Sequence, residues 1–295
     1  MAQEMAALGF THVELSHGIR IVLVPGLLRA VEEKVIRVAS THNFCPLPPG
    51  IMQAAPNLFE PSSRDPRERD QWLRYTKRSL EFAAQLGAGV LVCHLGSVGF
   101  FWFDPAVRLR AYLDRHAGLA GFARADFPER LKRTMSRIRE RMPLYWENLV
   151  ASLREIDAFA REKDVRLGFE NREKVEELPL DDEFETLFKA MGPTTQGGYW
   201  HDTGHAELKR RHGLLDHRQQ LAANASRSIG FHLHDVDTDG EDHQPVGTGC
   251  VDFEMVSEFW QPQHLLVLEL GPRATEEDVL LSKQRIEALL AARGF

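Results

Sequence analysis

Acidic residues and histidines recur at the ends of short apolar segments along this sequence. The members of this series are Glu14, His42, His94, Glu170, Asp202, His232 and Glu269. A buried carboxylate or imidazole costs roughly several kcal/mol unless it is paired or bound to a metal. One such residue alone is more often an ion-pair partner or a surface cap. Their repetition favours a divalent metal held by mixed Asp, Glu and His ligands, with positions left open for a substrate.

The elements that must position these residues are an alternation of strands and helices. The predicted strands are 12–16, 36–42, 89–94, 165–170, 198–202, 229–234 and 265–269. The predicted helices are 2–8, 69–86, 130–161, 182–190, 254–260 and 276–292. This alternation indicates parallel strands joined by right-handed helical crossovers.

The strand–helix units number one fewer than the eight of a closed α/β barrel. The sequence begins with a helical pattern, so we expect a TIM (β/α)8-type barrel that lacks its first strand or has an irregular one. A length of 295 residues would also allow two domains. We expect a single domain, 1–295, with long loops at 46–66 and 97–129. Both loops follow strand ends, where loops of a barrel build the active site.

The composition excludes several classes of protein. It is 43% hydrophobic and 27% charged, which is typical of a soluble globular protein. No apolar stretch approaches the ~20 residues of a membrane helix, and no signal peptide is visible, so we expect a cytoplasmic protein. Three scattered cysteines fit a reducing compartment. A net charge of −7 argues against a broad nucleic-acid-binding surface.

Five motifs, taken in their order and spacing, resemble those of the xylose-isomerase-like superfamily. This superfamily unites sugar phosphate isomerases and epimerases with AP endonucleases of the endonuclease IV type (AP endonuclease family 2). The motifs are His94-Leu95-Gly96-Ser97, Gly168-Phe169-Glu170-Asn171, Asp202-Thr203-Gly204-His205, His232-Leu233-His234-Asp235 and His243-Gln244-Pro245-Val246-Gly247-Thr248-Gly249.

The resemblance implies a TIM barrel with a metal held by Glu170, Asp202, His232 and Glu269. One of Glu170 and Glu269 would take the proton next to a carbonyl that the metal polarises, and the other would return it. His205 would contact the substrate. The implied activity is a metal-dependent isomerase or epimerase of carbohydrate metabolism, acting on a small sugar or sugar-like polyol. Dehydratases and lyases of the same superfamily use the same proton abstraction and stay as alternatives.

The endonuclease branch of the superfamily implies more ligands. His42 and His94 match its first-site histidines, with Glu170 as the bridging carboxylate. His205 and His243 match its third-site histidines, where Glu241 replaces an Asp. Ligands of this kind favour Zn or Mn and allow more than one ion. A Zn-dependent phosphodiesterase acting on abasic DNA is therefore the rival hypothesis, and a barrel that only binds or senses a metal is a third.

The remaining features receive simpler interpretations. Residues 235–240 resemble the start of an EF-hand loop, but its twelfth position is Val246, so we predict a solvated turn in which Asp235 supports His232. The basic run 130–141 is predicted to be a solvated helix face. The aromatic run 100–103 is predicted to be a lid or a homodimer interface. His201 and His234 neighbour predicted ligands, and the sequence does not decide their role. No role and a surface position are expected for His12, His17, His116, His212, His217 and His264.

Overall fold

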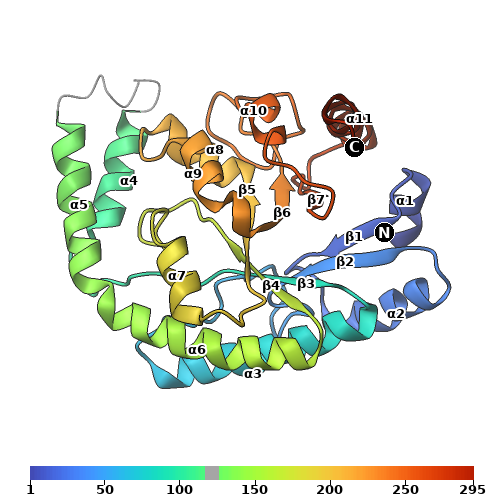
Figure 1. Ribbon diagram of the computed structural model, residues 1–295, viewed down its shortest axis with the longest axis horizontal. Coiled ribbons are helices and arrows are strands. Elements are labelled where there is room, and N and C mark those ends of the chain that lie inside the picture. Colours follow the sequence, from blue (N-terminus) through green and yellow to red (C-terminus); the bar gives the residue numbers. More distant parts are fainter. Residues whose placement is uncertain (117–125) are drawn as a thin grey trace. The chain divides into compact units, whose positions relative to one another are not determined.

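The computed structural model describes residues 1–116 and 126–295 (Figure 1). The chain divides into two compact units, which are described separately. The first unit comprises Met1–Gly96, Asn148–Glu170 and Thr186–Trp200. The second unit comprises Ser97–Glu147, Asn171–Glu185 and His201–Phe295.

The first unit is built around parallel strands that follow one another in chain order from β1 to the start of β5. The strands are β1 (His12–Leu15), β2 (Arg37–His42), β3 (Val90–Cys93), β4 (Arg166–Glu170) and β5 (Gly198–Asp202). The helices are α1 (Ala2–Ala7), η1 (Ile21–Leu23), α2 (Val24–Glu32), α3 (Pro66–Leu86), and most of α6 (Pro143–Glu162) and α7 (Phe184–Met191). Figure 1 shows α3 and α6 alongside each other, and Lys77 donates to Glu155 between them at 2.6 Å.

The second unit contains the end of β5 together with β6 (Ser228–Leu233) and β7 (Leu265–Leu268), which pair in parallel. Its helices are α4 (Pro105–Arg115), α5 (Phe127–Arg141), α8 (Thr203–Arg211), α9 (His217–Asn224), η3 (Ala225–Arg227), α10 (Phe253–Ser257) and α11 (Glu276–Arg293). Phe231 of β6 packs with Trp260 and Ile286 in one buried apolar cluster, so the helices after β6 cover this part of the sheet.

Local sequence explains where the helices begin and end. The Asp65 side chain accepts a hydrogen bond from the backbone N–H of Arg67 at the start of α3, and Gly87 ends that helix in the left-handed conformation. All four side chains of β3 are buried, as expected for a parallel strand covered on both faces. β3 ends at Cys93, so His94 is the first residue after this buried strand.

The predicted strands are confirmed, each end lying within one residue of its expected position. The single helix predicted over 130–161 is wrong. It consists of α5 and α6, which meet at Pro143, because a proline inside a helix lacks the N–H donor and clashes with the preceding turn.

The loop predicted over 97–129 is wrong where α4 forms. The Asp104 side chain caps this helix by accepting from the N–H groups of Ala106 and Val107, and Leu109 on the helix is buried against Phe127. Residues 117–125 of the predicted loop lie outside the described residues. Across residues 1–116 and 126–295, no helix combines the length and apolar character needed to cross a bilayer.

Candidate metal centres

Two histidines and one glutamate meet at strand ends in the first unit. His42 ends β2, His94 follows β3 and Glu170 ends β4, and all three side chains are buried. Nε2 of His94 lies 2.8 Å from Oε2 of Glu170, and Nε2 of His42 lies 3.3 Å from the same oxygen. The three side chains offer ligand atoms that all lie within 4.8 Å of one another. This spacing suits one cation bound by all three.

The second nitrogen of each of these imidazoles faces an acceptor. Nδ1 of His94 lies 2.8 Å from Oδ1 of Asn57, and Nδ1 of His42 lies 3.1 Å from the backbone carbonyl of Asn43. A carbonyl only accepts, so each Nδ1 carries the hydrogen. A neutral imidazole in this tautomer points its Nε2 lone pair at Glu170. That approach to a carboxylate is favourable only when Nε2 is protonated or a cation lies between them, so the donor set fits a metal.

His17 joins this cluster, although its expected place was the surface. Its ring centroid lies 4.8 Å from that of His42 and 6.5 Å from that of His94, and its side chain is half-buried.

Gly96, two residues after His94, has φ of +86°, and a Cβ there would lie 2.2 Å from Oγ of Ser62. Glycine is therefore required for the chain to leave this cluster as it does.

A second cluster lies in the second unit. Asp202 ends β5, His232 lies on β6 and Glu269 follows β7. Nδ1 of His232 is 3.0 Å from Oε2 of Glu269 and 3.8 Å from Oδ2 of Asp202. His232 and Asp202 are fully buried and Glu269 is half-buried. Two carboxylates and one imidazole at this spacing form a donor set that fits a divalent cation.

Asn171 fixes the end of β5 at this cluster. Its Nδ2 donates to the backbone carbonyl of Asp202 at 3.0 Å, and its Oδ1 accepts from the backbone N–H of Asp202 at 2.7 Å. Oδ1 of Asp202 in turn accepts the N–H of His205 and caps α8. Asn171 belongs to the motif Gly168-Phe169-Glu170-Asn171, which alone predicts no role for it, and the paired amide–backbone bonds show that it anchors Asp202.

His205 lies beside Asp202 with a defined tautomer. Its Nδ1 is 3.0 Å from the backbone carbonyl of Asn171, so Nδ1 carries the hydrogen and Nε2 keeps a lone pair for a ligand. Nη1 of Arg172 lies 3.3 and 3.5 Å from the two ring nitrogens, and Nε of Arg172 lies 3.3 Å from Oε1 of Glu177. The buried guanidinium group of Arg172 therefore lies against the imidazole of His205.

His243 approaches the second cluster from the loop after β6. Its Nε2 is 3.9 Å from Oε1 of Glu269, and its Nδ1 is 3.0 Å from Oδ1 of Asp242. Burial lowers the pKa of His243, but the hydrogen bond to Asp242 and the charge of Glu269 outweigh it and raise this pKa to about 9. Glu241 is exposed, and its backbone N–H donates to Asp237. Asp242, and not Glu241, is therefore the carboxylate beside His243.

A family described as xylose isomerase-like TIM barrel matches residues 2–261 of the sequence. The chain belongs to this family. The expected fold class, a TIM (β/α)8-type barrel, is thereby confirmed, and the described residues contribute seven parallel strands to it. No curated protein matches this xylose isomerase-like chain significantly.

Solved structures similar to this xylose isomerase-like protein include two sugar epimerases. D-psicose 3-epimerase with D-tagatose, from Clostridium cellulolyticum H10, has a TM-score of 0.65 at 11% identity, covering 98% of this chain and 92% of that one. The 3-keto-D-glucoside 4-epimerase of E. coli has a TM-score of 0.63 at 13% identity, covering 97% and 92%. A protein from Thermus thermophilus soaked with ZnCl2 has a TM-score of 0.59 at 20% identity, covering 98% and 92%. At these identities the likeness establishes the fold.

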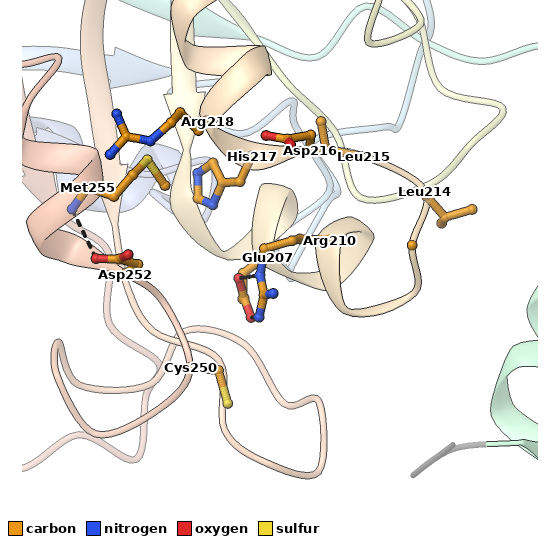
Figure 2. Close-up of a pocket in the computed structure, with 11 residues that line it drawn as sticks. Glu207, Arg210, Leu214, Leu215, Asp216, His217, Arg218, Cys250, Asp252 and Met255 are labelled. Carbon is orange, nitrogen blue, oxygen red and sulfur yellow. Dashed lines mark hydrogen bonds and ion pairs between the residues drawn. The ribbon is translucent and has the colours of Figure 1, made fainter. Parts of the chain in front are cut away.

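A pocket of about 770 Å³ opens elsewhere in the second unit, between α8, α9 and the segment before α10. Figure 2 shows His217, Arg210 and Asp252 among its lining residues. Nε2 of His217 is 2.9 Å from Nε2 of His201, which is fully buried. Burial and the nearby charge of Arg210 lower the pKa of His217 to about 4. The residues of the two clusters do not line this pocket.

The surface position expected for His217 and His264 is wrong, because both are buried.

The solvated turn expected over 235–240 is also wrong at its first residue. Asp235 is fully buried, and its two carboxylate oxygens accept from the backbone N–H groups of Val236, Gly247, Gly249 and Val251. Asp235 therefore organises the loop that follows His243 by satisfying its amides.

The basic and aromatic runs lie in the second unit. Most side chains of 130–141 in α5 are exposed, and Nε of Arg133 lies 3.6 Å from Oε1 of Glu129. Both observations agree with the predicted solvated helix face. Phe101, Trp102 and Phe103 are each more than two-thirds exposed. A lid or a homodimer interface at 100–103 stays a prediction.

Proposed function

We propose that this protein is a divalent-metal-dependent isomerase or epimerase that acts on a small sugar or sugar-like polyol. The observation that carries the proposal is the second cluster, in which Asp202, His232 and Glu269 gather oxygen and nitrogen donors at the ends of β5, β6 and β7. The epimerases with the same fold act on sugars, and they support this choice of substrate class.

Glu170 is proposed to complete the ligand set with Asp202, His232 and Glu269. It is the last residue of β4, as Asp202 is the last residue of β5, and parallel neighbouring strands present their carboxyl ends to the same edge of a sheet. Mixed carboxylate and imidazole donors favour Mn or Zn. A bound ion of this kind would act as a Lewis acid, polarising a substrate carbonyl and acidifying the neighbouring C–H group.

Glu170 and Glu269 are the proposed acid–base pair, and the family resemblance points to the same two residues. One carboxylate removes the proton next to the carbonyl and the other returns a proton. Glu269 lies among the imidazoles of the second unit, with Oε2 3.0 Å from Nδ1 of His232 and Oε1 3.9 Å from Nε2 of His243. His205, with its Nε2 lone pair, and His243 are proposed to contact substrate hydroxyls or a further ion.

The test is proton exchange in heavy water. The purified protein, supplied with Mn²⁺ or Zn²⁺, is incubated in D2O with a panel of ketoses that includes D-tagatose, and deuterium is located by NMR. The proposal expects deuterium at the carbon next to the carbonyl together with an isomeric sugar, and neither product with Glu269→Gln or Glu170→Gln. Lack of exchange with every sugar, from a protein shown to bind metal, would overturn the isomerase assignment. Loss of water from the substrate after exchange would instead identify a dehydratase or lyase.

A second candidate function, phosphodiester hydrolysis of abasic DNA, is favoured by the first cluster. His42, His94 and Glu170 form a donor set that an isomerase using only the four proposed ligands does not need. A metal-bound hydroxide is the nucleophile that such a reaction requires. An abasic duplex incubated at low and raised salt tests this candidate, because cleavage that depends on phosphate contacts falls steeply with salt through counterion release. Isomerisation of an uncharged sugar should survive the same salt.

A further inference from the structure

His234 makes hydrogen bonds through both ring nitrogens. Its ring also lies close enough to His243 and Glu269 for the three side chains to be considered as ligands of one metal ion. Its side chain is fully buried in the second unit. Its Nδ1 accepts from the backbone N–H of His243 at 2.8 Å. Its Nε2 lies 3.0 Å from Oδ2 of Asp202. Because a backbone N–H can only donate, Nδ1 must hold the lone pair and Nε2 must carry the hydrogen that is donated to Asp202.

This tautomer decides between two roles for His234. The ligand atoms of His234, His243 and Glu269 lie close enough to hold a cation together. Direct ligation by His234 would require a lone pair on the nitrogen that faces the ion. The nitrogen with the lone pair is occupied by the amide of His243, and the nitrogen that faces Asp202 carries a hydrogen.

The packing around His234 holds the ring in this orientation. A Cβ added at Gly204 would lie 2.1 Å from Cε1 and 2.5 Å from Nδ1 of His234, so the first turn of α8 lies directly against the ring. On another side, the ring of His243 stacks on His234 with centroids 4.2 Å apart and planes 8° apart. Thr203 donates to the backbone carbonyl of His234 at 2.7 Å and accepts its N–H at 3.1 Å.

We propose that His234 is a positioning residue that ties Asp202 to the His243 loop and does not itself bind the metal. Through Nε2–H it fixes the rotamer of the Asp202 carboxylate, and through Nδ1 it fixes the backbone of His243. One imidazole thereby sets the spacing between a carboxylate ligand and the loop that carries His243. The inference rests on the proposed function only in taking Asp202 as a metal ligand.

Two variants of His234 separate positioning from ligation. His234→Gln keeps an amide N–H near the position of Nε2, whereas His234→Leu keeps the bulk and removes both polar contacts. Zn²⁺ affinity is measured by competition with a chromophoric chelator on the full-length protein. Groups that orient a metal ligand typically contribute about 10- to 100-fold in affinity. We expect His234→Leu to weaken Zn²⁺ binding by about this factor and His234→Gln to retain most of the affinity. His217→Leu removes another buried imidazole of the same unit and serves as the matched control, with unchanged affinity expected.

A direct readout needs neither metal nor substrate. The long-range ¹H–¹⁵N imidazole spectrum of the metal-free wild-type protein, with the His234 signals identified by their loss in His234→Gln, reports the tautomer. We expect the Nε2–H form, and the Nδ1–H form would overturn the inference. Equal loss of Zn²⁺ affinity in the Gln and Leu variants would assign His234 as a ligand and also overturn it. A wild-type protein that binds neither Zn²⁺ nor Mn²⁺ would refute the proposed function, and the spectrum would still decide the hydrogen bond. If the Gln variant does not fold, Gly204→Ala identifies the same signals by shifting them.

Discussion

Gly204 and His234 are in such close contact that no side chain fits between them, since a Cβ on Gly204 would lie 2.1 Å from Cε1 of the ring. The contact joins the first turn of α8 to the end of β6, and so it joins the capping carboxylate of Asp202 to the loop that begins at Asp235. Gly204 has no positive φ, so its requirement is steric and not conformational.

Gly204→Ala is therefore predicted to destabilise the protein. The methyl group must displace a fully buried ring, and overpacking of this kind costs about 1–3 kcal/mol. The free energy of unfolding is measured by urea denaturation. Gly26→Ala is the control, because it lies inside α2 with nothing within 4 Å of its added Cβ, and replacing glycine there should stabilise by roughly 0.5–1 kcal/mol. A Gly204→Ala protein as stable as the wild type would contradict the close contact.

Glu170→Gln is predicted to abolish tight metal binding by the first cluster. In the set His42, His94 and Glu170, the carboxylate of Glu170 is the one anionic donor. Its Oε2 lies 2.8 Å from Nε2 of His94 and 3.3 Å from Nε2 of His42. Replacing it with a neutral amide should weaken Zn²⁺ binding by at least about 100-fold, or about 2.7 kcal/mol. Equilibrium dialysis of the full-length protein measures this loss. Glu155→Gln, which removes an exposed carboxylate paired with Lys77, should leave the affinity unchanged.

Metal removal is predicted to lower the thermal stability of the protein. The clusters gather carboxylates and imidazoles that a cation would hold together, and a ligand bound only by the folded state stabilises it by about 2.7 kcal/mol at a free concentration of 100 times Kd. The unfolding temperature followed by circular dichroism should rise when Mn²⁺ or Zn²⁺ is added and return to its first value with a chelator. An unfolding temperature independent of both ions would argue against either cluster as a metal centre.

The strand ends could be predicted from the sequence because an apolar run that stops at a polar residue is a local signal. This signal predicts Glu170 and Asp202 at strand ends, and both residues end their strands. The role of His234 could not be found in this way, because it depends on contacts of its ring with Gly204 and with the backbone N–H of His243 that only the folded chain brings together. The position of His17 beside His42 likewise depends on how β1 pairs with β2.

Two missed helices did carry a usable signal. Asp202 and Asp216 cap α8 and α9 by accepting the N–H three residues later, and Asp followed by a short polar helix is a recognised N-cap pattern. At Asp202 the N-cap pattern and the predicted metal ligand fall on the same carboxylate. One oxygen of Asp202 accepts the amide N–H of His205 while the other lies 3.0 Å from Nε2 of His234, so one side chain both caps α8 and contacts His234.

Glu269→Gln is predicted to remove catalysis while leaving the fold intact. Glu269 is half-buried, and a glutamine of the same shape keeps the contact at 3.0 Å from Nδ1 of His232, so little stability should be lost. A neutral amide cannot accept the substrate proton, and loss of a general base costs about 10²- to 10⁴-fold in kcat. Steady-state kinetics with an identified sugar measure the loss, with unfolding curves as the control. Unchanged kcat would remove Glu269 from the acid–base pair.

The stability of the protein is predicted to fall in acid partly through His217. Its pKa is lowered from 6.5 to about 4 in the folded protein by burial and by Arg210. Between these values the unfolded chain binds a proton that the folded chain does not, so the free energy of unfolding decreases as the pH falls from about 6.5 to about 4. The full effect of the His217 shift is about 3 kcal/mol. His217→Gln should be less stable than the wild type at pH 7 but lose less stability by pH 4.5. Urea unfolding at both pH values measures the difference, with His116→Gln as the control, and equal pH slopes for wild type and His217→Gln would refute it.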